Sequence, residues 1–254
     1  MLRTDVRVDT HARLTGSHKT LENIYTSGKY LEVTESWHAE DARWKATQIK
    51  SMIDVHHLRP KTIAEIGCGS GAVIHELSAC EGLQEARLEG YDISPQAIEL
   101  ARQWADDRTS FFQQDLLAAD NRKYFDILLV VDVFEHVPDY MGFVAKCKSK
   151  AEFKIFHIPL DIHVSSVLRN AFIKNRYTIG HIHYFTAESA IDTLRDTGHE
   201  VLDSVYTNVA FGLFKEHPSV KRAVANVPRW LFSKLSVPFA ARVLGGYSLL
   251  VLTR

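Results

Sequence analysis

The feature that most constrains the fold is an apolar segment that runs into three alternating glycines, Ile63-Ala64-Glu65-Ile66-Gly67-Cys68-Gly69-Ser70-Gly71-Ala72. Gly67 permits a sharp turn from a strand into a helix, and Gly69 and Gly71 let a ligand approach the backbone without meeting a Cβ atom. The first N–H groups of the following helix suit a carboxylate or a phosphate. The segment therefore predicts a strand, a tight turn and a helix, with a ligand bound at the turn.

Short β-type runs alternate with helical stretches on both sides of this turn. Strands are predicted at 61–66, 86–93, 110–114, 125–131, 153–158, 200–206 and 247–252, and helices at 72–80, 95–106, 140–149 and 186–196. This alternation predicts an α/β fold, with a parallel sheet covered by helices on both faces. Upstream, apolar residues at helical spacing in 20–57 predict a helical N-terminal cap that Pro60 closes. We therefore expect an arm and cap over 1–58 and the main domain over 59–254.

Composition narrows the class of protein. The 254 residues are 46% hydrophobic and 24% charged, which supports one sizeable core and excludes a disordered chain. The formal net charge of -1 gives no reason to expect a nucleic acid partner. Three scattered cysteines predict no disulfide framework, and we find neither a secretory signal nor an apolar run of membrane-spanning length. We expect a soluble, cytoplasmic protein.

Carboxylates end the strands that follow the glycine turn. Asp92 ends the second predicted strand and can accept both hydroxyl groups of a ribose, and Asp115 ends the third. With Glu65, these side chains surround the crevice in which such sheets bind ligands. A dinucleotide-binding loop would read G-x-G-x-x-G, whereas the third glycine here falls one place early. That departure counts against a nicotinamide cofactor.

At this point the sequence resembles the class I S-adenosylmethionine-dependent methyltransferases. The resemblance runs through 65–71, 90–94 and 114–116, continues in 126–137, and includes His181-Ile182-His183-Tyr184-Phe185-Thr186 with the helix after it. It implies a Rossmann-like, mostly parallel seven-stranded sheet whose last strand is antiparallel. It also implies S-adenosyl-L-methionine as the cofactor, with methyl transfer to oxygen or nitrogen of a small-molecule acceptor.

The resemblance assigns the glycine turn to the methionine end of the cofactor. The resemblance implies that this end is held by Glu65, Gly67, Gly69 and Gly71. It also implies that Cys68 fills a position for a small residue and that its thiol is inert.

The other end of the cofactor falls to the next two strands. Asp92 would bind the ribose hydroxyls, Ile93 would pack on the adenine, and Asp115 would accept its amino group, with Leu116 as a backbone contact.

The segment just after the fourth predicted strand holds four residues that are expected near the reacting groups. The resemblance puts Asp132 and Val133 near the sulfonium of the cofactor. Glu135 and His136 are the catalytic candidates, because an imidazole has a suitable pKa for a general base. The alternative is that they cap the following helix or bind each other.

The string Asp132-x-x-Glu135-His136 also resembles the metal-binding motif of small-RNA 3′-end 2′-O-methyltransferases. In that family a later histidine completes the site, and His157, His163, His181 and His183 are available here. Asp132 stands where that family has Glu, and similar strings occur in metal-free methyltransferases. We therefore predict no metal, and keep metal-assisted RNA ribose methylation as the alternative function. An inactive binding subunit is a third reading, against which the retained Glu65, Asp92 and Asp115 argue.

Aromatic residues and histidines are the candidates for the acceptor site. The resemblance places Tyr25, Tyr30, Trp37, Trp44 and Lys45 where related enzymes build a lid, although aromatic residues at helical spacing are more often core. His181 and His183 flank Ile182 and could form a wall against the acceptor, or be ordinary core or surface histidines.

A long insertion, about 208–245, precedes the last predicted strand. Residues 217–254 carry six cations and no acid, so this tail is +6 and the remainder of the chain is -7. Apolar residues interleave with these cations, so 220–242 could contact a membrane surface, an anionic acceptor or a partner, or simply pack against the sheet edge. Pro218, Pro228 and Pro238 predict that the insertion is broken into short pieces.

Overall fold

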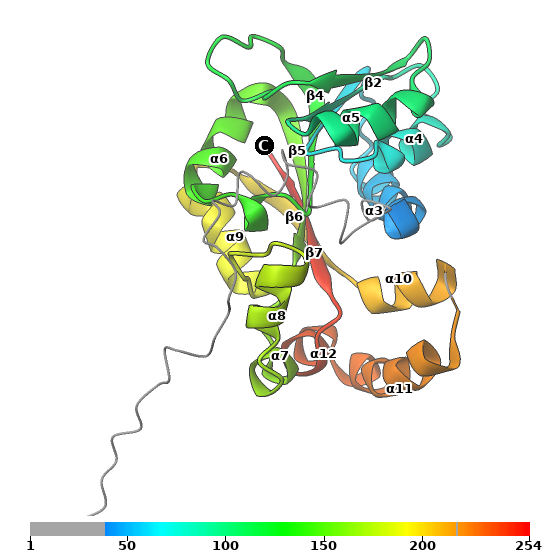
Figure 1. Cartoon of the computed structure of the whole chain (residues 1–254), viewed down its shortest axis with the longest axis vertical. Coiled ribbons are helices and arrows are strands. Elements are labelled where there is room, and N and C mark those ends of the chain that lie inside the picture. Colours follow the sequence, from blue (N-terminus) through cyan, green and yellow to red (C-terminus); the bar gives the residue numbers. More distant parts are fainter. Residues whose placement is uncertain (1–38, 217) are drawn as a thin grey trace, which may run out of the picture.

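The computed structural model describes residues 39–216 and 218–254, and this part holds a seven-stranded sheet in the order β3-β2-β1-β4-β5-β7-β6 (Figure 1). The strands are β1 (Thr62–Ile66), β2 (Arg87–Asp92), β3 (Thr109–Gln113), β4 (Phe125–Val131), β5 (Ala151–Pro159), β6 (Val201–Thr207) and β7 (Ser248–Thr253). The pairs from β3 to β5 are parallel, and β7 is antiparallel to both of its neighbours. The predicted α/β class and the mostly parallel sheet with an antiparallel last strand are confirmed.

Helices cover both faces of this sheet (Figure 1). On one face lie α3 (Ala42–Val55), α4 (Ala72–Ser78) and α5 (Pro95–Ala101), and on the other α6 (Tyr140–Cys147) and α9 (Ala187–Asp196). The remaining helices are α7 (Val164–Leu168), α8 (Ala171–Thr178), α10 (Val209–Glu216), α11 (Val220–Leu235) and α12 (Val237–Leu244). Within the described ranges, no helix has the length and apolar character needed to cross a membrane.

The central strand β4 explains why this sheet must be covered twice. Leu128 and Val130 are buried in a core cluster with residues of α6 and α9, whereas Ile127 and Leu129 belong to a second cluster with residues of α3 and α4. Because successive side chains point to opposite faces, a strand buried on both sides reads as one continuous apolar run. The described part of the predicted cap, α3, shares the second of these cores.

The helical insertion before the last strand is confirmed as α10 to α12, but its expected breaks are only partly right. Pro228 lies inside α11, which is 16 residues long, so the prediction of a break there is wrong. Proline removes one helical hydrogen bond, and side-chain bonds beside it hold the helix in place. Asn226 donates to the Ala210 carbonyl at 3.1 Å, and Arg229 donates to the Gly245 carbonyl at 2.9 Å.

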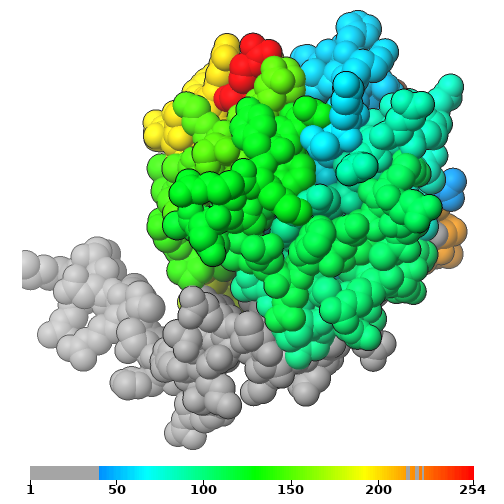
Figure 2. All heavy atoms as spheres, turned by 90° about the horizontal axis from the view of Figure 1, so that it is seen from above, coloured from blue at the N-terminus to red at the C-terminus, as the bar shows by residue number. Residues whose placement is uncertain are grey.

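Four of the helices that follow β5 and β6 gather at one end of the molecule. Helices α7, α8, α11 and α12 lie where the parallel strands finish, and the C-terminus lies at the opposite end (Figure 1). Figure 2 looks onto that opposite end, with the red C-terminal residues beside the yellow residues near position 200. There Glu200 and Arg254 exchange backbone hydrogen bonds of 3.0 and 2.9 Å.

The carboxylate of Asp126 closes the start of the central strand pair. Its Oδ2 accepts the N–H groups of Lys61 at 2.7 Å and Thr62 at 2.9 Å. Replacing Asp126 by Ala leaves these donors without their acceptor, so we expect the free energy of unfolding to fall by about 1–3 kcal/mol in urea titration. Exposed Asp120 is the control position, and equal stability of Asp126→Ala and Asp120→Ala would contradict the expectation.

Candidate functional site

Left-handed backbone shapes the turn after β1. Gly67, Gly69 and Gly71 have φ angles of 68°, 54° and 75°, a region that L side chains disfavour. The N–H groups of Gly67 and Cys68 donate to the Tyr91 carbonyl at 2.7 and 3.1 Å. A Cβ atom on Gly67 would lie 2.8 Å from a methyl group of Val133, and one on Gly71 would lie 2.5 Å from the ring of Phe111. The protein's own packing therefore also demands glycine at Gly67 and Gly71.

Two carboxylates converge on this turn. Asp92, at the end of β2, accepts the Gly69 N–H at 3.0 Å and the Ser94 N–H at 2.8 Å. Burial raises the pKa of Asp92, and these N–H donors oppose that shift. Glu65 on β1 is buried, and its Oε2 has no hydrogen-bond partner among the described residues. Burial raises the pKa of Glu65 well above its ordinary value, although the charge of Lys45 opposes the rise.

The residues predicted for the adenine end are presented at the same edge of the sheet. Ile93 is 53% exposed directly after Asp92, which is unusual for a large apolar side chain and leaves it open to a ligand. Asp115 is exposed after β3 and accepts the Leu117 N–H at 2.8 Å, while Leu116 is fully buried. Cys68 is a free, buried cysteine, and burial raises the pKa of its thiol well above the usual value, so it is unreactive.

A buried lysine on α3 reaches across to the end of β4. Lys45 Nζ lies 2.9 Å from Asp41 and 2.8 Å from Asp132, and Asp132 Oδ1 lies 2.7 Å from His157 Nδ1. His157 Nε2 lies 3.2 Å from the hydroxyl of Thr207 at the end of β6. The network therefore links α3 to the site ends of β4, β5 and β6.

Opposite charges set the ionisation of this network. Burial alone would lower the pKa of Lys45, but Asp132 and Asp41 outweigh it and the pKa rises. Burial would raise the pKa of Asp132, but His157 and Lys45 outweigh it and hold the pKa well below its usual range. Sequence reasoning missed the contact between Lys45 and Asp132. The only hint of this contact in the sequence was that a lysine stands among the apolar residues of a predicted helix.

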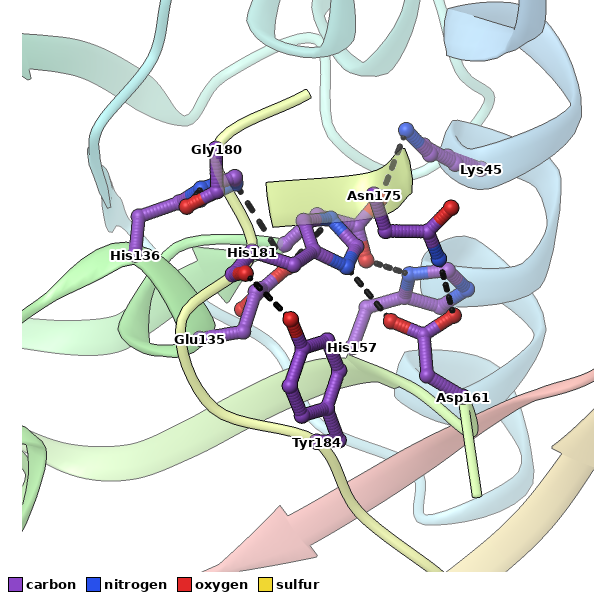
Figure 3. A network of polar contacts seen from close by, with 10 residues as sticks. Lys45, Glu135, His136, His157, Asp161, Asn175, Gly180, His181 and Tyr184 are labelled. Atoms are coloured by element: carbon purple, nitrogen blue, oxygen red, sulfur yellow. Dashed lines mark hydrogen bonds and ion pairs between the residues drawn. The ribbon is translucent and has the colours of Figure 1, made fainter. Parts of the chain in front are cut away.

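The carboxylate of Glu135 is enclosed and faces two imidazoles (Figure 3). Glu135 is fully buried in the 3-10 turn Phe134–His136, with Oε1 3.9 Å from His136 Nε2 and 4.0 Å from His181 Nε2. Neither carboxylate oxygen has a hydrogen-bond partner among the described residues. Burial, and then the charge of Asp132, raise the pKa of Glu135 well above its ordinary value. Such a buried acid is costly unless something compensates it.

Backbone bonds fix this cluster, and a different residue caps the next helix. The N–H groups of Ile182 and His183 both donate to the Glu135 carbonyl at 3.0 Å, so the segment after α8 is held against the 3-10 turn. The side chain of Asp139 caps α6 by accepting the Gly142 N–H at 2.9 Å. The alternative in which Glu135 or His136 caps that helix is therefore wrong.

The other candidate residues lie in separate places. His183 packs on Tyr140 with ring centroids 4.5 Å apart, whereas the His181 ring turns toward Glu135, so the two do not share one wall. His163 caps α7. Trp44 packs its ring edge against His157, with 6.0 Å between centroids, beside Gly212 of α10. Tyr25, Tyr30 and Trp37 lie outside the described residues.

The Lys45 contact generates a stability prediction. Replacing Lys45 by Met leaves Asp132 and Asp41 partly enclosed without their cation, so we expect the free energy of unfolding to fall by about 3–5 kcal/mol. The control is Lys50→Met on the same helix, where the pair with the more exposed Asp54 contributes about 1 kcal/mol or less. Urea denaturation of both variants measures the difference, and equal losses would refute a special role for Lys45.

Known proteins resemble this chain in sequence and in fold. A ubiquinone biosynthesis O-methyltransferase of Paraburkholderia xenovorans is 29% identical over 55% of this chain and 64% of its own length. This chain spans only 64% of the length of that relative, and 56% of the length of a second ubiquinone biosynthesis O-methyltransferase, from Haemophilus ducreyi.

Two solved structures share the fold over most of their length. A magnesium protoporphyrin IX methyltransferase from Synechocystis PCC 6803, solved with S-adenosylhomocysteine, has a TM-score of 0.58 at 16% identity, covering 92% of this chain and 97% of its own. An N-methyltransferase from Bradyrhizobium japonicum WM9, also with S-adenosylhomocysteine, has a TM-score of 0.58 at 18% identity and covers 91% and 98%.

A family model described as a methyltransferase domain matches residues 38–204, which include the glycine turn, Asp92, Asp132 and the Glu135 cluster. The resemblance read from the sequence is thereby confirmed, and the chain belongs to the methyltransferase-domain family of the class I, S-adenosylmethionine-dependent type.

Proposed function

We propose that this chain transfers a methyl group from S-adenosylmethionine to an oxygen atom of a small-molecule acceptor. The observation that carries the proposal is the cradle formed by the left-handed glycine turn after β1, the buried Glu65 oxygen without a partner and the Asp92 carboxylate beside it. A cationic, hydroxyl-bearing ligand fits these acceptors, because carboxylates accept hydrogen bonds from ammonium and ribose groups.

In this proposal the cofactor lies along the ends of β1, β2 and β3. Glu65 and the glycine turn hold the methionine end, Asp92 binds the ribose hydroxyls, and Ile93 covers the adenine. Asp115 and Leu116 complete the adenine end. The exposed face of Ile93 and the backbone N–H groups at the turn support these assignments.

S-adenosylmethionine supplies a methyl group on a sulfonium, and the acceptor oxygen takes it as the carbon–sulfur bond breaks and the acceptor proton leaves to water. The chain's contribution is to position the acceptor in line with that bond. In this proposal Asp132 and Val133, which follow β4, help to position the reacting groups, and the contact with Lys45 holds Asp132 in place. Glu135 and His136 lie on the acceptor side. The sequence relatives of this chain named above are O-methyltransferases, which favours oxygen over nitrogen as the acceptor atom.

A second part of the proposal is that the protein works in the cytoplasm and touches anionic membrane lipid. All three cysteines are free, as a reducing compartment requires. Helices α7, α8, α11 and α12 contain no acidic residue, yet they carry cations and large exposed apolar side chains. Leu168 is 81% exposed, Val224 66% and Leu235 83%. Since α12 contacts both α7 and α11, these four helices, which we call the acid-free end, form one surface at which cations attract anionic lipid and apolar groups insert. Arg242 of α12 is already paired with Glu188 of α9 and is not counted among these cations.

The cofactor cradle predicts the effect of losing one carboxylate. Asp92→Ala removes the acceptor for two ribose hydroxyls, so we expect S-adenosylmethionine to bind roughly ten- to a hundred-fold more weakly, at about 1.5–3 kcal/mol for a hydrogen bond to a charged group. Isothermal titration calorimetry measures it, with exposed Asp107→Ala as the matched control. If the wild-type chain binds neither S-adenosylmethionine nor S-adenosylhomocysteine, the proposed function is wrong.

The acid-free end predicts vesicle binding. We expect the full chain to float with vesicles of phosphatidylcholine and phosphatidylglycerol, and to lose most of this binding in the double variant Val224→Asp, Leu235→Asp. The control is Val55→Asp, because Val55 is 65% exposed, nearly the same as Val224, but lies at the end of α3 away from these helices. Equal flotation of both variants, or binding to pure phosphatidylcholine alone, would contradict an electrostatic lipid contact.

A further inference from the structure

We infer that Glu135, His136 and His181 bind a divalent transition-metal ion. One ligand atom from each of these residues lies within 4.8 Å of the others, and they come from two segments that are far apart in the sequence. The sequence favoured no metal at this place and left a metal-assisted reaction as the alternative, and the side-chain geometry now favours the metal.

The separations suit an ion and are too long for direct hydrogen bonds. Glu135 Oε1 lies 3.9 Å from His136 Nε2 and 4.0 Å from His181 Nε2. Two ligand atoms that are each about 2.1 Å from one ion are at most about 4.2 Å apart. Both Glu135 pairs meet this limit, and the wider separation in the group, within 4.8 Å, would close by a few tenths of an ångström around the ion. A cation between them would also neutralise Glu135, whose two buried oxygens have no hydrogen-bond partner among the described residues. An uncompensated carboxylate at a fully buried position is otherwise costly.

Acceptors behind both imidazoles aim their Nε2 atoms at the centre of the cluster (Figure 3). His136 Nδ1 lies 3.0 Å from the carbonyl oxygen of Gly180, and His181 Nδ1 lies 2.5 Å from Asp161 Oδ2. These oxygens can only accept, so they place the ring protons on Nδ1. Histidines that bind metals are oriented in this way, by a carboxylate or a carbonyl on the nitrogen that does not face the ion.

The residues around Asp161 keep this arrangement in place. Asn175 of α8 donates to Asp161 Oδ1 at 3.3 Å, and the hydroxyl of Tyr184 donates to the His181 carbonyl at 2.9 Å. Asp132 takes no part in the site, because Lys45 and His157 occupy its carboxylate. The ligand set is therefore one carboxylate and two imidazoles, a set that suits ions such as Zn²⁺, Fe²⁺, Mn²⁺ or Co²⁺ and leaves coordination positions open.

The open positions give the ion a role in the proposed function, and this part of the inference rests on that function. A hydroxyl oxygen of the acceptor bound to the ion loses its proton to water more easily, which leaves an oxyanion as the nucleophile. His136 then acts as a ligand and not as a free base. The acceptor class that this site selects is a small molecule with an ionisable hydroxyl group, such as a phenol.

Cobalt is the probe for the site, because its visible absorption reports the ligands directly. We expect the chelator-treated full chain to bind one Co²⁺ with new absorption bands and a higher melting temperature. Glu135→Gln and His181→Ala should weaken binding at least a hundred-fold, and Asp161→Asn, which removes no ligand, by roughly 10–100-fold. His183→Ala is the matched control from the same segment and should bind as the wild type does.

The result that overturns the inference is absence of Co²⁺ binding by the wild-type chain, or equal affinity in all four variants. A variant that fails to fold is recognised by circular dichroism, and Asp161→Asn then decides, since its ligands are intact. Titration of the metal-free chain with S-adenosylmethionine separates the two proposals. Cofactor binding without Co²⁺ binding refutes the metal site alone, and Co²⁺ binding without cofactor binding refutes the proposed function alone.

Discussion

The contact between Lys45, Asp132 and His157 joins the parts of this protein that have to meet at the site. Asp132 follows the central strand β4 with a φ of 51°, a left-handed conformation that is uncommon for a residue with a side chain. Two partners hold it there, the Lys45 ammonium from α3 and the His157 imidazole from β5. Because the pair is largely shielded from water, its attraction is strong, and so is the cost of losing either partner. The position of Glu135 and His136, which follow within one turn, depends on this anchor.

Separate devices build the two halves of the site. On the proposed cofactor side, backbone conformation dominates, because glycines bring N–H groups and carboxylates together at the ends of β1 and β2. On the proposed acceptor side, side chains dominate, since Glu135, His136 and His181 lie close together with hydrogen-bond acceptors behind both rings. This division matches the chemistry, in which one ligand is common to a family and the other differs among its members.

Much of the geometry of the candidate site was predictable from sequence because its signals are local. The turn 65–71 and Asp92 are read from adjacent residues, since glycines and a strand-ending carboxylate carry their meaning within a few positions. The partner of Glu135 was not predictable in this way. Four later histidines were available, and choosing His181 required knowing that the segment after α8 hydrogen-bonds to the Glu135 carbonyl. The same holds for Lys45, whose partner Asp132 lies on another element, and for α11, where contacts to α10 and Gly245 hold the helix through Pro228.

The sequence by itself determined the alternation of strands and helices, the mostly parallel sheet, the glycine turn and the carboxylates at the strand ends. Periodicity, turn chemistry and strand order act over short stretches of chain, so one sequence is enough to read them. Only the tertiary structure decided which histidine faces Glu135, which cation holds Asp132 and which helices share the acid-free end. These are contacts between segments far apart in sequence, and nothing in the local pattern fixes their distance until the core has packed.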